Sequence, residues 1–333
     1  MAEPLLEVRD LSVQLRTHRG PAYAVRNVSF TLERGATLGL VGESGCGKSI
    51  TVMALMGLLP ESARVTGSIV FEGQELVGRT DRQMCELRGD RMGMIFQEPM
   101  TALNPVHTIG RQVAEPLRLH RGMSAAQARD EAIRLLDRVG IPDAARRFDA
   151  YPHQFSGGQR QRITIAMALA CGPDLLIADE PTTALDVTIQ RQILELIREL
   201  VAERGMALLL ISHDLGVIAQ NVARMLVMYG GSVVESGTTA QVFAKPMHPY
   251  TLGLFGARPG LLGAKGKRLA TIPGTVPELV DLPPGCPFAG RCRFTIAECH
   301  TTVPPAYEVD PGHPARCIRL DAVAADKAKE VTP

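Results

Sequence analysis

The sequence contains no tryptophan, and aromatic residues make up only 4% of its 333 residues. Aliphatic and methionine side chains must therefore fill the hydrophobic core. Hydrophobic residues account for 45% of the chain, which is enough for one large domain and a smaller appendage.

Strong net charge and long apolar runs are also missing. The formal net charge is +1, which gives no support for a nucleic-acid partner. The longest apolar runs, such as residues 207–211, are far shorter than the roughly 18 residues that a membrane span needs. No signal-peptide pattern is found at the N-terminus. We therefore expect an intracellular protein that depends on another polypeptide for any passage across a membrane.

Short apolar segments alternate with amphipathic ones along most of the chain. This alternation predicts an α/β fold with a parallel sheet, and the change of pattern after about residue 98 predicts a helical insertion. The expected strands are 5–15, 24–33, 37–41, 67–71, 92–96, 175–178, 207–211, 225–229 and 232–235. The expected helices are 48–59, 124–139, 159–170, 188–203 and 215–219.

Residues 42–49 match the phosphate-binding pattern G-x-x-x-x-G-K-[ST]. Its glycines allow the backbone to wrap a phosphate, and the helix that follows offers its N-terminus to negative charge. Lys48 would reach the β- and γ-phosphates, and the Ser49 hydroxyl would bind Mg²⁺. An expected strand before the pattern and an expected helix after it strengthen the prediction of an ATP and Mg²⁺ site.

An acidic pair, Asp179 and Glu180, ends the apolar strand expected at 175–178. Buried carboxylates are costly unless they bind a cation or hydrogen-bond donors. Beside a P-loop, we expect Asp179 to hold Mg²⁺ and Glu180 to polarise the attacking water. A plain strand-end acidic pair or helix cap is the alternative.

A second glycine-rich turn, Ser156-Gly157-Gly158-Gln159, precedes an expected helix. It again offers bare backbone and a helix N-terminus to an anion, although a turn with an N-cap also explains it. With this turn the sequence resembles the ATP-binding subunits of ABC transporters over about residues 5–257. Phe155 stands where the family signature LSGGQ has leucine.

The resemblance implies a P-loop NTPase fold with an antiparallel β subdomain and a helical insertion at about 98–160. It assigns Gln97 to the Q-loop, residues 184–186 to the D-loop and His213 to the switch histidine. It implies that Lys48, Gln97, Glu180 and His213 act in catalysis and that Ser49, Gln97 and Asp179 serve Mg²⁺. The nucleotide-contacting set that it implies is Tyr23, Gly42, Glu43, Ser44, Gly45, Cys46, Gly47, Lys48, Ser49, Ile50, Gln97, Ser156, Gly158, Gln159, Asp179 and Asp186.

In the family, two such domains pair head to tail, and each ATP lies between the P-loop of one and the signature turn of the other. Two phosphate-gripping elements in one chain would then serve two different ATP molecules. Tyr23 is the only aromatic residue just upstream of Val25 and is the candidate for stacking on adenine; a surface or strand tyrosine is the alternative.

Four of the seven cysteines lie in the last sixth of the chain, at Cys286, Cys292, Cys299 and Cys317. Their spacing is not that of a C-x-x-C zinc site. Ligation of a [4Fe–4S] cluster, zinc with His300 or His313 as an extra ligand, and unligated thiols all remain open from the spacing.

Residues 247–251 and 286–292 resemble the C-terminal region of oligopeptide/dipeptide-type ABC subunits, some of which carry an iron–sulfur cluster. The resemblance implies a nucleotide-binding domain at 1–258 and a cysteine-rich extension at 259–320. Composition after about residue 258 predicts a linker at 260–267 and a disordered tail at 321–333. It implies two transmembrane permeases, a second ATP-binding subunit in a homo- or heterodimer, an extracytoplasmic solute-binding protein and a peripheral place on the cytoplasmic face of the inner membrane.

Peptide import is the leading hypothesis for function. Import of nickel or another small solute, a soluble ABC ATPase without a membrane partner, and a structural scaffold with an inactive nucleotide site are the alternatives. The chain has one nucleotide domain and no heptad run, unlike the two-domain translation-type and coiled-coil chromosome-type soluble members.

Overall fold

The computed structural model describes residues 3–183, 185–257 and 272–331, with the side chains of 99, 100 and 327–331 left out. The strands are β1 (Leu6–Thr17), β2 (Gly20–Leu32), β3 (Thr37–Val41), β4 (Arg64–Phe71), β5 (Gln74–Glu75), β6 (Met92–Ile95), β7 (Leu175–Asp179), β8 (Ala207–Ser212), β9 (Arg224–Tyr229), β10 (Ser232–Thr238), β11 (Tyr307–Asp310) and β12 (His313–Ala315).

The α-helices are α1 (Lys48–Leu55), α2 (Asp81–Cys85), α3 (Pro99–Ala102), α4 (Ile109–Arg121), α5 (Ala125–Arg138), α6 (Ala144–Arg147), α7 (Gly157–Ala168), α8 (Val187–Arg204), α9 (Leu215–Asn221), α10 (Thr239–Ala244), α11 (Pro249–Gly256) and α12 (Leu320–Val331). Short 3-10 helices are η1 (Pro152–Gln154), η2 (Ala289–Arg291) and η3 (Ala297–His300). Every strand and helix expected from the sequence is present, with shifts of a few residues at the ends.

A mixed sheet of eight strands runs through the molecule in the order β11-β12-β10-β9-β3-β8-β7-β6. Pairing is parallel from β9 through β3, β8 and β7 to β6, as expected for an α/β fold. Strand β10 runs antiparallel to β9, and β12 pairs with β10 in the same sense. The cysteine-rich extension therefore adds two strands to the sheet of the nucleotide domain.

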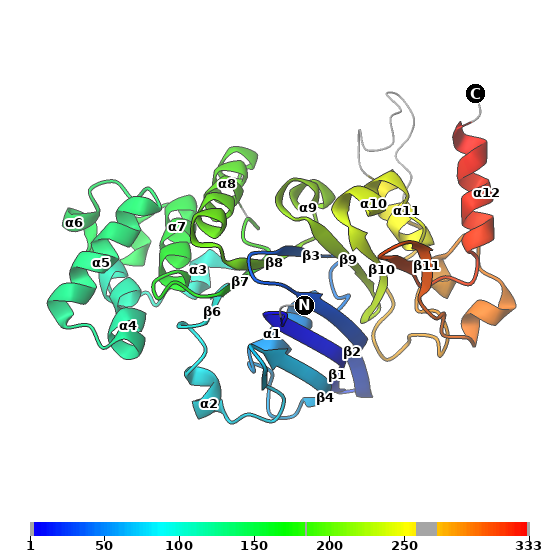
Figure 1. The fold of residues 1–333 in the computed structure, drawn as a ribbon, viewed down its shortest axis with the longest axis horizontal. Helices are drawn as coiled ribbons and strands as arrows, with labels where there is room; N and C mark the ends of the chain where they lie inside the picture. Colours follow the sequence, from blue (N-terminus) through cyan, green and yellow to red (C-terminus); the bar gives the residue numbers. More distant parts are fainter. Residues whose placement is uncertain (1–2, 184, 258–271, 332–333) are drawn as a thin grey trace.

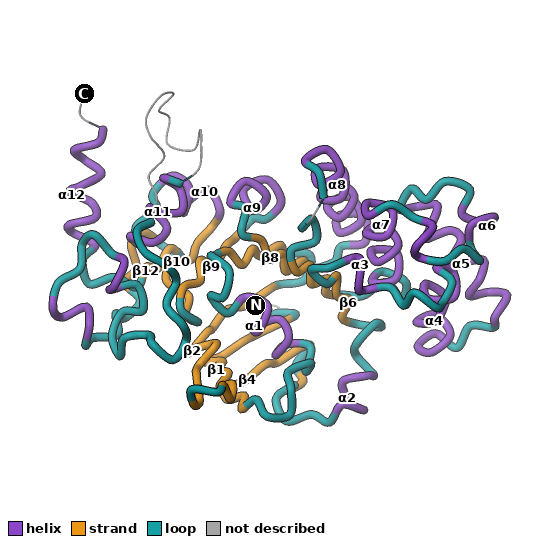
Figure 2. The backbone as a smooth tube through the Cα atoms, turned by 180° about the vertical axis from the view of Figure 1, so that it is seen from behind, coloured by secondary structure: helices purple, strands orange, loops and turns teal. Residues whose placement is uncertain are grey.

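A second sheet, β2-β1-β4-β5, is antiparallel and forms the expected β subdomain. Figure 1 shows helix α1 between this sheet and the central one, with α8 and α9 on the opposite face of the central sheet. The helical insertion, α3 to α7, lies at the end of the central sheet away from the C-terminal extension, as the view from behind also shows (Figure 2).

Alternate residues of the central strands enter two separate cores. On β8, Leu209 and Ile211 pack beside α1, whereas Leu208 and Leu210 pack on the face covered by the other helices. This period of two is the ordinary consequence of the pleat, and burial on both faces explains why these strands read as unbroken apolar runs.

Two expectations about helices were wrong in detail. Helix α1 stops at Leu55 rather than near residue 59 because Gly57 takes a left-handed φ of 61° and the Leu58 amide donates to the Met53 carbonyl. The tail expected to be disordered forms α12 up to Val331, where alanines, lysines and a glutamate favour a helix. The linker expected at 260–267 lies outside the described residues.

Candidate functional site

The P-loop joins the end of β3 to the start of α1. Gly42 and Gly47 have φ angles of 158° and 104°. A Cβ atom at Gly42 would come within 2.3 Å of the Met228 carbonyl oxygen, and one at Gly47 within 2.4 Å of the Ala24 carbonyl oxygen. Glycine is therefore required at both ends of the loop. Ser44 and Gly45 lie exposed at its tip, while Cys46 is buried.

Lys48 is 5% exposed and begins α1. Its ammonium donates hydrogen bonds to the carbonyl oxygens of Gly42, at 2.8 Å, and Glu43, at 3.0 Å. The lysine thus lies across the mouth of its own loop, with its charge inside the curve of the backbone. A phosphate bound by the loop would meet that charge directly.

Asp179, the last residue of β7, is 5% exposed, and one of its carboxylate oxygens is buried without a hydrogen-bond partner. Burial raises the pKa of Asp179, and a hydrogen bond from Ser49 opposes that rise. An unsatisfied buried carboxylate oxygen beside a hydroxyl group is costly in an apolar setting and is a good ligand set for Mg²⁺. Asp179 and Ser49 therefore fit the cation that the sequence predicts.

Glu180 brings two other predicted residues, Gln97 and His213, together. Its side chain is 13% exposed, and one carboxylate oxygen accepts hydrogen bonds from Gln97, at 3.3 Å, and Thr183, at 3.1 Å. The same oxygen lies 3.1 Å from the Nδ1 atom of His213. Glu180 has a φ of 46°, which is uncommon for a residue other than glycine and is typical of functional sites.

The signature turn lies elsewhere. Ser156 caps α7, with its hydroxyl accepting from the Gln159 amide at 3.3 Å and its own amide donating to the Gln159 side chain at 3.1 Å. In both Figure 1 and Figure 2, α7 lies with the helical insertion, away from α1. A single chain therefore does not bring Ser156, Gly158 and Gln159 to its own P-loop.

The other predicted contact residues lie on β2, on α1 and at the start of α8. Tyr23 is 46% exposed on β2 and lines a hollow with Arg26. Ile50 packs from α1 against the core. The Asp186 carboxylate caps α8 by accepting from two backbone amides, at 3.1 and 3.0 Å, and Ala184 of the predicted D-loop lies outside the described residues.

Three residues around these sites were missed from the sequence. Thr183 supports Glu180, the Tyr250 hydroxyl accepts from the Glu43 amide at 2.7 Å, and Arg291 forms an ion pair with Glu43. Of these three residues, only Thr183 lies close in sequence to the residue that it contacts, Glu180, and this proximity is the one sequence feature that could have indicated a role. Tyr250 and Arg291 are 207 and 248 residues from Glu43, so no spacing could have found them.

The four C-terminal cysteines line one small cavity together with His248 and Phe288. Burial raises the pKa of the Cys286 thiol to about 12 and that of Cys317 to about 11. Within the described part of the chain, no group of three or more His, Cys, Asp or Glu residues is arranged for a single metal ion. His313, offered as a zinc ligand, instead lies 2.8 Å from Glu235 in the core.

Residues 25–183 match the ABC transporter family, and residues 234–299 match the C-terminal region of oligopeptide/dipeptide transporters. A Brucella melitensis protein, whose name assigns it to peptide import as the ATP-binding subunit, is 50% identical and covers 97% of this chain and 99% of its own. The oligopeptide transport ATP-binding protein OppD of Salmonella typhimurium is 49% identical, and the match covers 96% of this chain and 94% of OppD. The chain belongs to the ABC transporter family.

Among solved structures, a dimeric ATP-binding cassette in a post-hydrolysis state, bound to ADP and phosphate, is similar to this ABC ATPase. The TM-score is 0.63 at 28% identity, and the match covers 70% of this chain and 98% of that one. The fold and the family establish that this chain is an ATP-hydrolysing subunit of the ABC transporter family. Within the described residues, no helix of the ATPase is both long enough and apolar enough to cross a bilayer.

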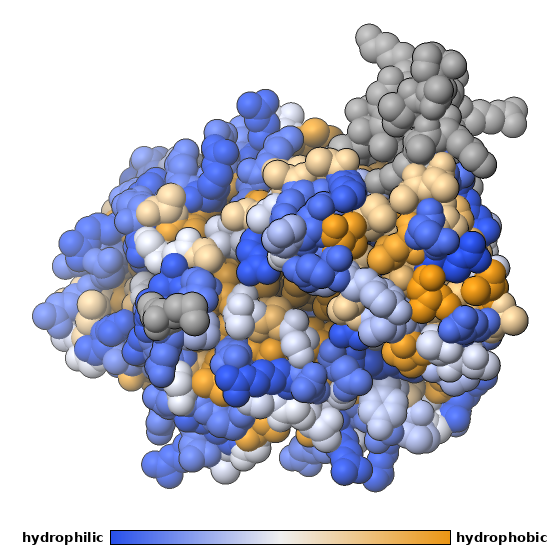
Figure 3. Space-filling model, turned by 45° about the vertical axis from the view of Figure 1, so that its right-hand side comes forward, coloured by the Kyte–Doolittle hydropathy of each residue, from blue (hydrophilic) through white to orange (hydrophobic). Residues whose placement is uncertain are grey.

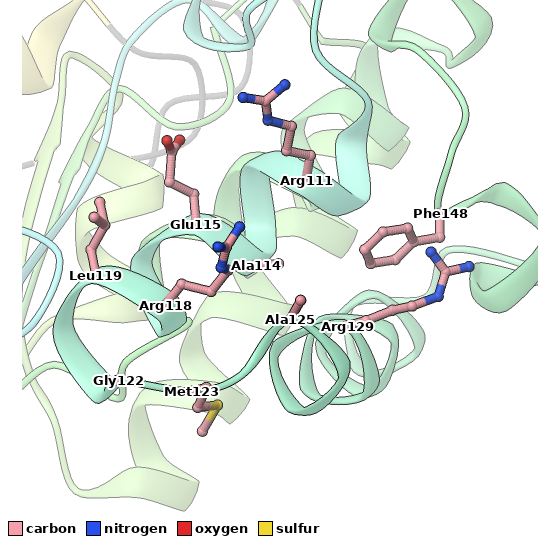
Figure 4. A pocket seen from close by; sticks show the side chains of 10 residues that line it. All are labelled: Arg111, Ala114, Glu115, Arg118, Leu119, Gly122, Met123, Ala125, Arg129 and Phe148. Atoms are coloured by element: carbon pink, nitrogen blue, oxygen red, sulfur yellow. The ribbon is translucent and has the colours of Figure 1, made fainter.

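A separate hollow of about 600 Å³ lies in the helical insertion of the ABC ATPase (Figure 4). Arg111 and Arg118 on α4 and Arg129 on α5 line it, and the Arg129 guanidinium lies 4.1 Å from the centre of the Phe148 ring. None of the predicted nucleotide residues lines this hollow, so it lies apart from the ATP site.

Proposed function

We propose that this ABC ATPase powers the import of di- or oligopeptides by ATP-driven closure of an ATPase dimer. The observation that carries the proposal is the match of residues 234–299 to the oligopeptide/dipeptide transporter C-terminal region. The names of the relatives, which cover nearly the whole chain, support the same substrate class. Nickel or another small solute is the alternative cargo, because specificity would lie in the binding protein and permeases.

The proposed chemistry is in-line attack of water on the γ-phosphate. Lys48 would stabilise charge on the phosphates, and Asp179 with Ser49 would hold Mg²⁺, which shields the phosphate charge. Glu180 would orient the water and accept its proton. These roles are supported by the buried lysine in the loop and by the carboxylate oxygen of Asp179 that has no partner.

Six more residues would complete the site. Gln97 and His213 both lie within hydrogen-bond distance of Glu180, which is where the γ-phosphate and its water would be sensed. Tyr23 would stack on adenine. Ser156, with Gly158 and Gln159, would reach the ATP of the partner subunit.

The proposed assembly contains two transmembrane permeases, a second ATP-binding subunit, identical or not, and an extracytoplasmic solute-binding protein. The ATPase would lie on the cytoplasmic face of the inner membrane. A net charge of +1 leaves no reason to add a nucleic acid to these partners.

The cargo is tested by transport. The subunit, its co-purifying permeases and the cognate binding protein are reconstituted in proteoliposomes, and uptake of a labelled tripeptide is compared with uptake of Ni²⁺. We expect ATP-dependent tripeptide uptake that stops when Lys48 is replaced by alanine. Uptake of Ni²⁺ alone would replace peptide as the cargo, and purification without any permease would contradict the transporter role.

We further propose that Cys286, Cys292, Cys299 and Cys317 hold a [4Fe–4S] cluster with a structural role. Support comes from the small buried cavity that all four cysteines line. The ligands of one zinc ion must lie close together, because each Zn–S bond is about 2.3 Å, whereas the ligands of a four-iron cluster lie farther apart. The lack of a single-ion arrangement among the described residues therefore does not argue against a cluster. Zinc remains the alternative.

After anaerobic purification, we expect about four iron atoms and four acid-labile sulfides per chain, with a brown colour. Replacing Cys299 by serine should abolish the colour, because a cluster that lacks one thiolate is lost or degraded. Replacing Cys85, which is exposed and distant in sequence, is the matched control and should leave it unchanged. Stoichiometric zinc without iron would refute the cluster.

A further inference from the structure

The cysteine-rich extension lies directly against the P-loop. Arg291, in the short helix η2 between Cys286 and Cys292, forms a two-pronged ion pair with Glu43, at 2.7 and 3.1 Å. The arginine side chain is only 7% exposed and that of Glu43 is 29% exposed. Paired guanidinium–carboxylate hydrogen bonds of this kind fix direction as well as distance. Glu43 occupies a position of the P-loop pattern at which any residue is allowed.

Arg291 is itself held firmly. Its guanidinium also donates to the carbonyl oxygens of Pro273, at 2.9 Å, and Gly274, at 3.3 Å, and it lies 3.4 Å from the Tyr229 hydroxyl. Besides Glu43, the guanidinium therefore contacts two backbone carbonyl groups and a fully buried tyrosine. Glu43 meets an anchored partner rather than a mobile surface arginine.

A second contact acts on the backbone of the same P-loop residue. The Glu43 amide donates to the hydroxyl of Tyr250, which is fully buried. The Tyr250 ring lies 4.7 Å from that of Tyr229 and 5.4 Å from that of Phe288, centre to centre. Phe288 belongs to the extension and lines the cysteine cavity. The extension thus supports the loop through an aromatic cluster as well as through Arg291.

A third contact passes through the turn between β9 and β10. A Cβ atom at Gly230 would lie 2.8 Å from the Cβ of Pro287, so the extension closes tightly on this turn. The next residue, Gly231, donates its amide to the Cys46 carbonyl at 3.1 Å. The P-loop is therefore supported near both its first and its last residues from the side of the extension.

Figure 3 shows apolar side chains mixed with hydrophilic ones on the side of the molecule that carries the extension. Arg19, on the turn between β1 and β2, adds an exposed ion pair to Asp281, at 2.6 Å, and another to Glu278, at 2.9 Å. Exposed pairs of this kind contribute little energy. The partly buried contacts at Glu43 therefore hold the extension to the P-loop more strongly than the Arg19 pairs do.

A flexible phosphate-binding loop loses conformational entropy when ATP orders it, and a loop that is already fixed does not. Within the proposed nucleotide site, we propose that Arg291 is a positioning residue: it holds the P-loop in its phosphate-binding conformation through Glu43 and thereby raises the affinity for MgATP. Arg291 acts through Glu43 and touches no reacting atom. This inference rests on the proposed function in one respect, that the P-loop is the ATP site.

The test measures equilibrium binding of MgATP to the purified full-length chain, in a Glu180→Gln background so that ATP is not consumed. We expect Arg291→Ala to weaken binding roughly tenfold, less than the roughly hundredfold loss that a 1 Å displacement of a reacting group causes. Arg291→Lys should give an intermediate loss, because lysine keeps the charge but not the two-pronged contact. The Michaelis constant of the assembled transporter should rise while kcat stays the same.

Two further variants separate positioning from general damage. Glu43→Gln leaves every other contact of Arg291 in place and should weaken MgATP binding similarly without changing the melting temperature. The exchange Glu43→Arg with Arg291→Glu should recover part of the affinity. Arg293→Ala is the matched control, since Arg293 lies two residues away and pairs with Asp326 on the surface.

Unchanged MgATP affinity in both Arg291→Ala and Glu43→Gln would overturn the inference, as would losses in these two variants that simply add in the double variant. Lys48→Ala distinguishes this failure from failure of the proposed function. If Lys48→Ala abolishes binding while the Arg291 and Glu43 variants bind normally, only the positioning role falls. If Lys48→Ala binds normally, the P-loop is not the ATP site and both proposals fall.

Discussion

Replacing Glu180 by glutamine is expected to leave MgATP binding intact and to lower the rate of hydrolysis about a hundredfold to ten-thousandfold, the usual contribution of a general base. Glutamine has nearly the same shape and can still accept hydrogen bonds from Gln97 and Thr183, so the site should keep its geometry. It cannot accept a proton from water. The measurements are single-turnover hydrolysis and equilibrium binding on the same preparation.

Glu195→Gln is the matched control, because Glu195 is a half-exposed glutamate on α8 that pairs only weakly with Arg198, at 3.6 Å. It should hydrolyse ATP at the normal rate. Hydrolysis by Glu180→Gln at the rate of the unmodified protein would remove Glu180 from the role of base. Loss of binding together with turnover would show instead that Glu180 holds the nucleotide or the fold of the site.

The elements around the nucleotide site were predictable because their signals are local. Apolar strands, a glycine-rich turn and a lysine at the helix start occupy adjacent positions, and Gly42 and Gly47 are fixed by close contacts that no other residue allows. The helix end at Leu55 was missed because the prediction placed the end of the helix just before Pro60, whereas Gly57 terminates α1 earlier. The helix α12 was missed because its helix propensity was outweighed by its polar composition.

Contacts between distant segments could not be read from spacing. The pairing of β12 with β10, which joins the extension to the central sheet, rests on a single register pair, Glu235 with Ala315. The Glu43–Arg291 contact spans 248 residues. Glu43 lies at a variable position of its motif, and an arginine in a loop-rich segment is usually exposed. Neither residue type therefore predicts that the two form an ion pair.

The position of Ser156 on α7, away from α1, leads to the second prediction: hydrolysis requires a second subunit. Ser156→Ala should lower the ATPase rate about a hundredfold, the cost of losing one donor to transition-state charge. Ser124→Ala is the matched control, because Ser124 caps α5 with the same reciprocal bonds to a glutamine three residues later. Both variants should lose about 1 kcal/mol of stability with the cap, and only Ser156→Ala should lose activity.

Mixing two inactive variants tests the shared site directly. In a homodimer of Lys48→Ala with Ser156→Ala, one ATP site carries both changes and the other carries none. Head-to-tail symmetry pairs the P-loop of one subunit with the signature turn of the other. Equal mixing makes half of the dimers mixed, and each mixed dimer has one intact site of two. Activity should therefore recover to about a quarter of the normal rate. In a heterodimer, the two changes placed on different subunits should leave one working site, whereas both placed in one subunit should damage both sites. A lone subunit that hydrolyses ATP at full rate, independent of its concentration, would show that each chain builds a complete site by itself.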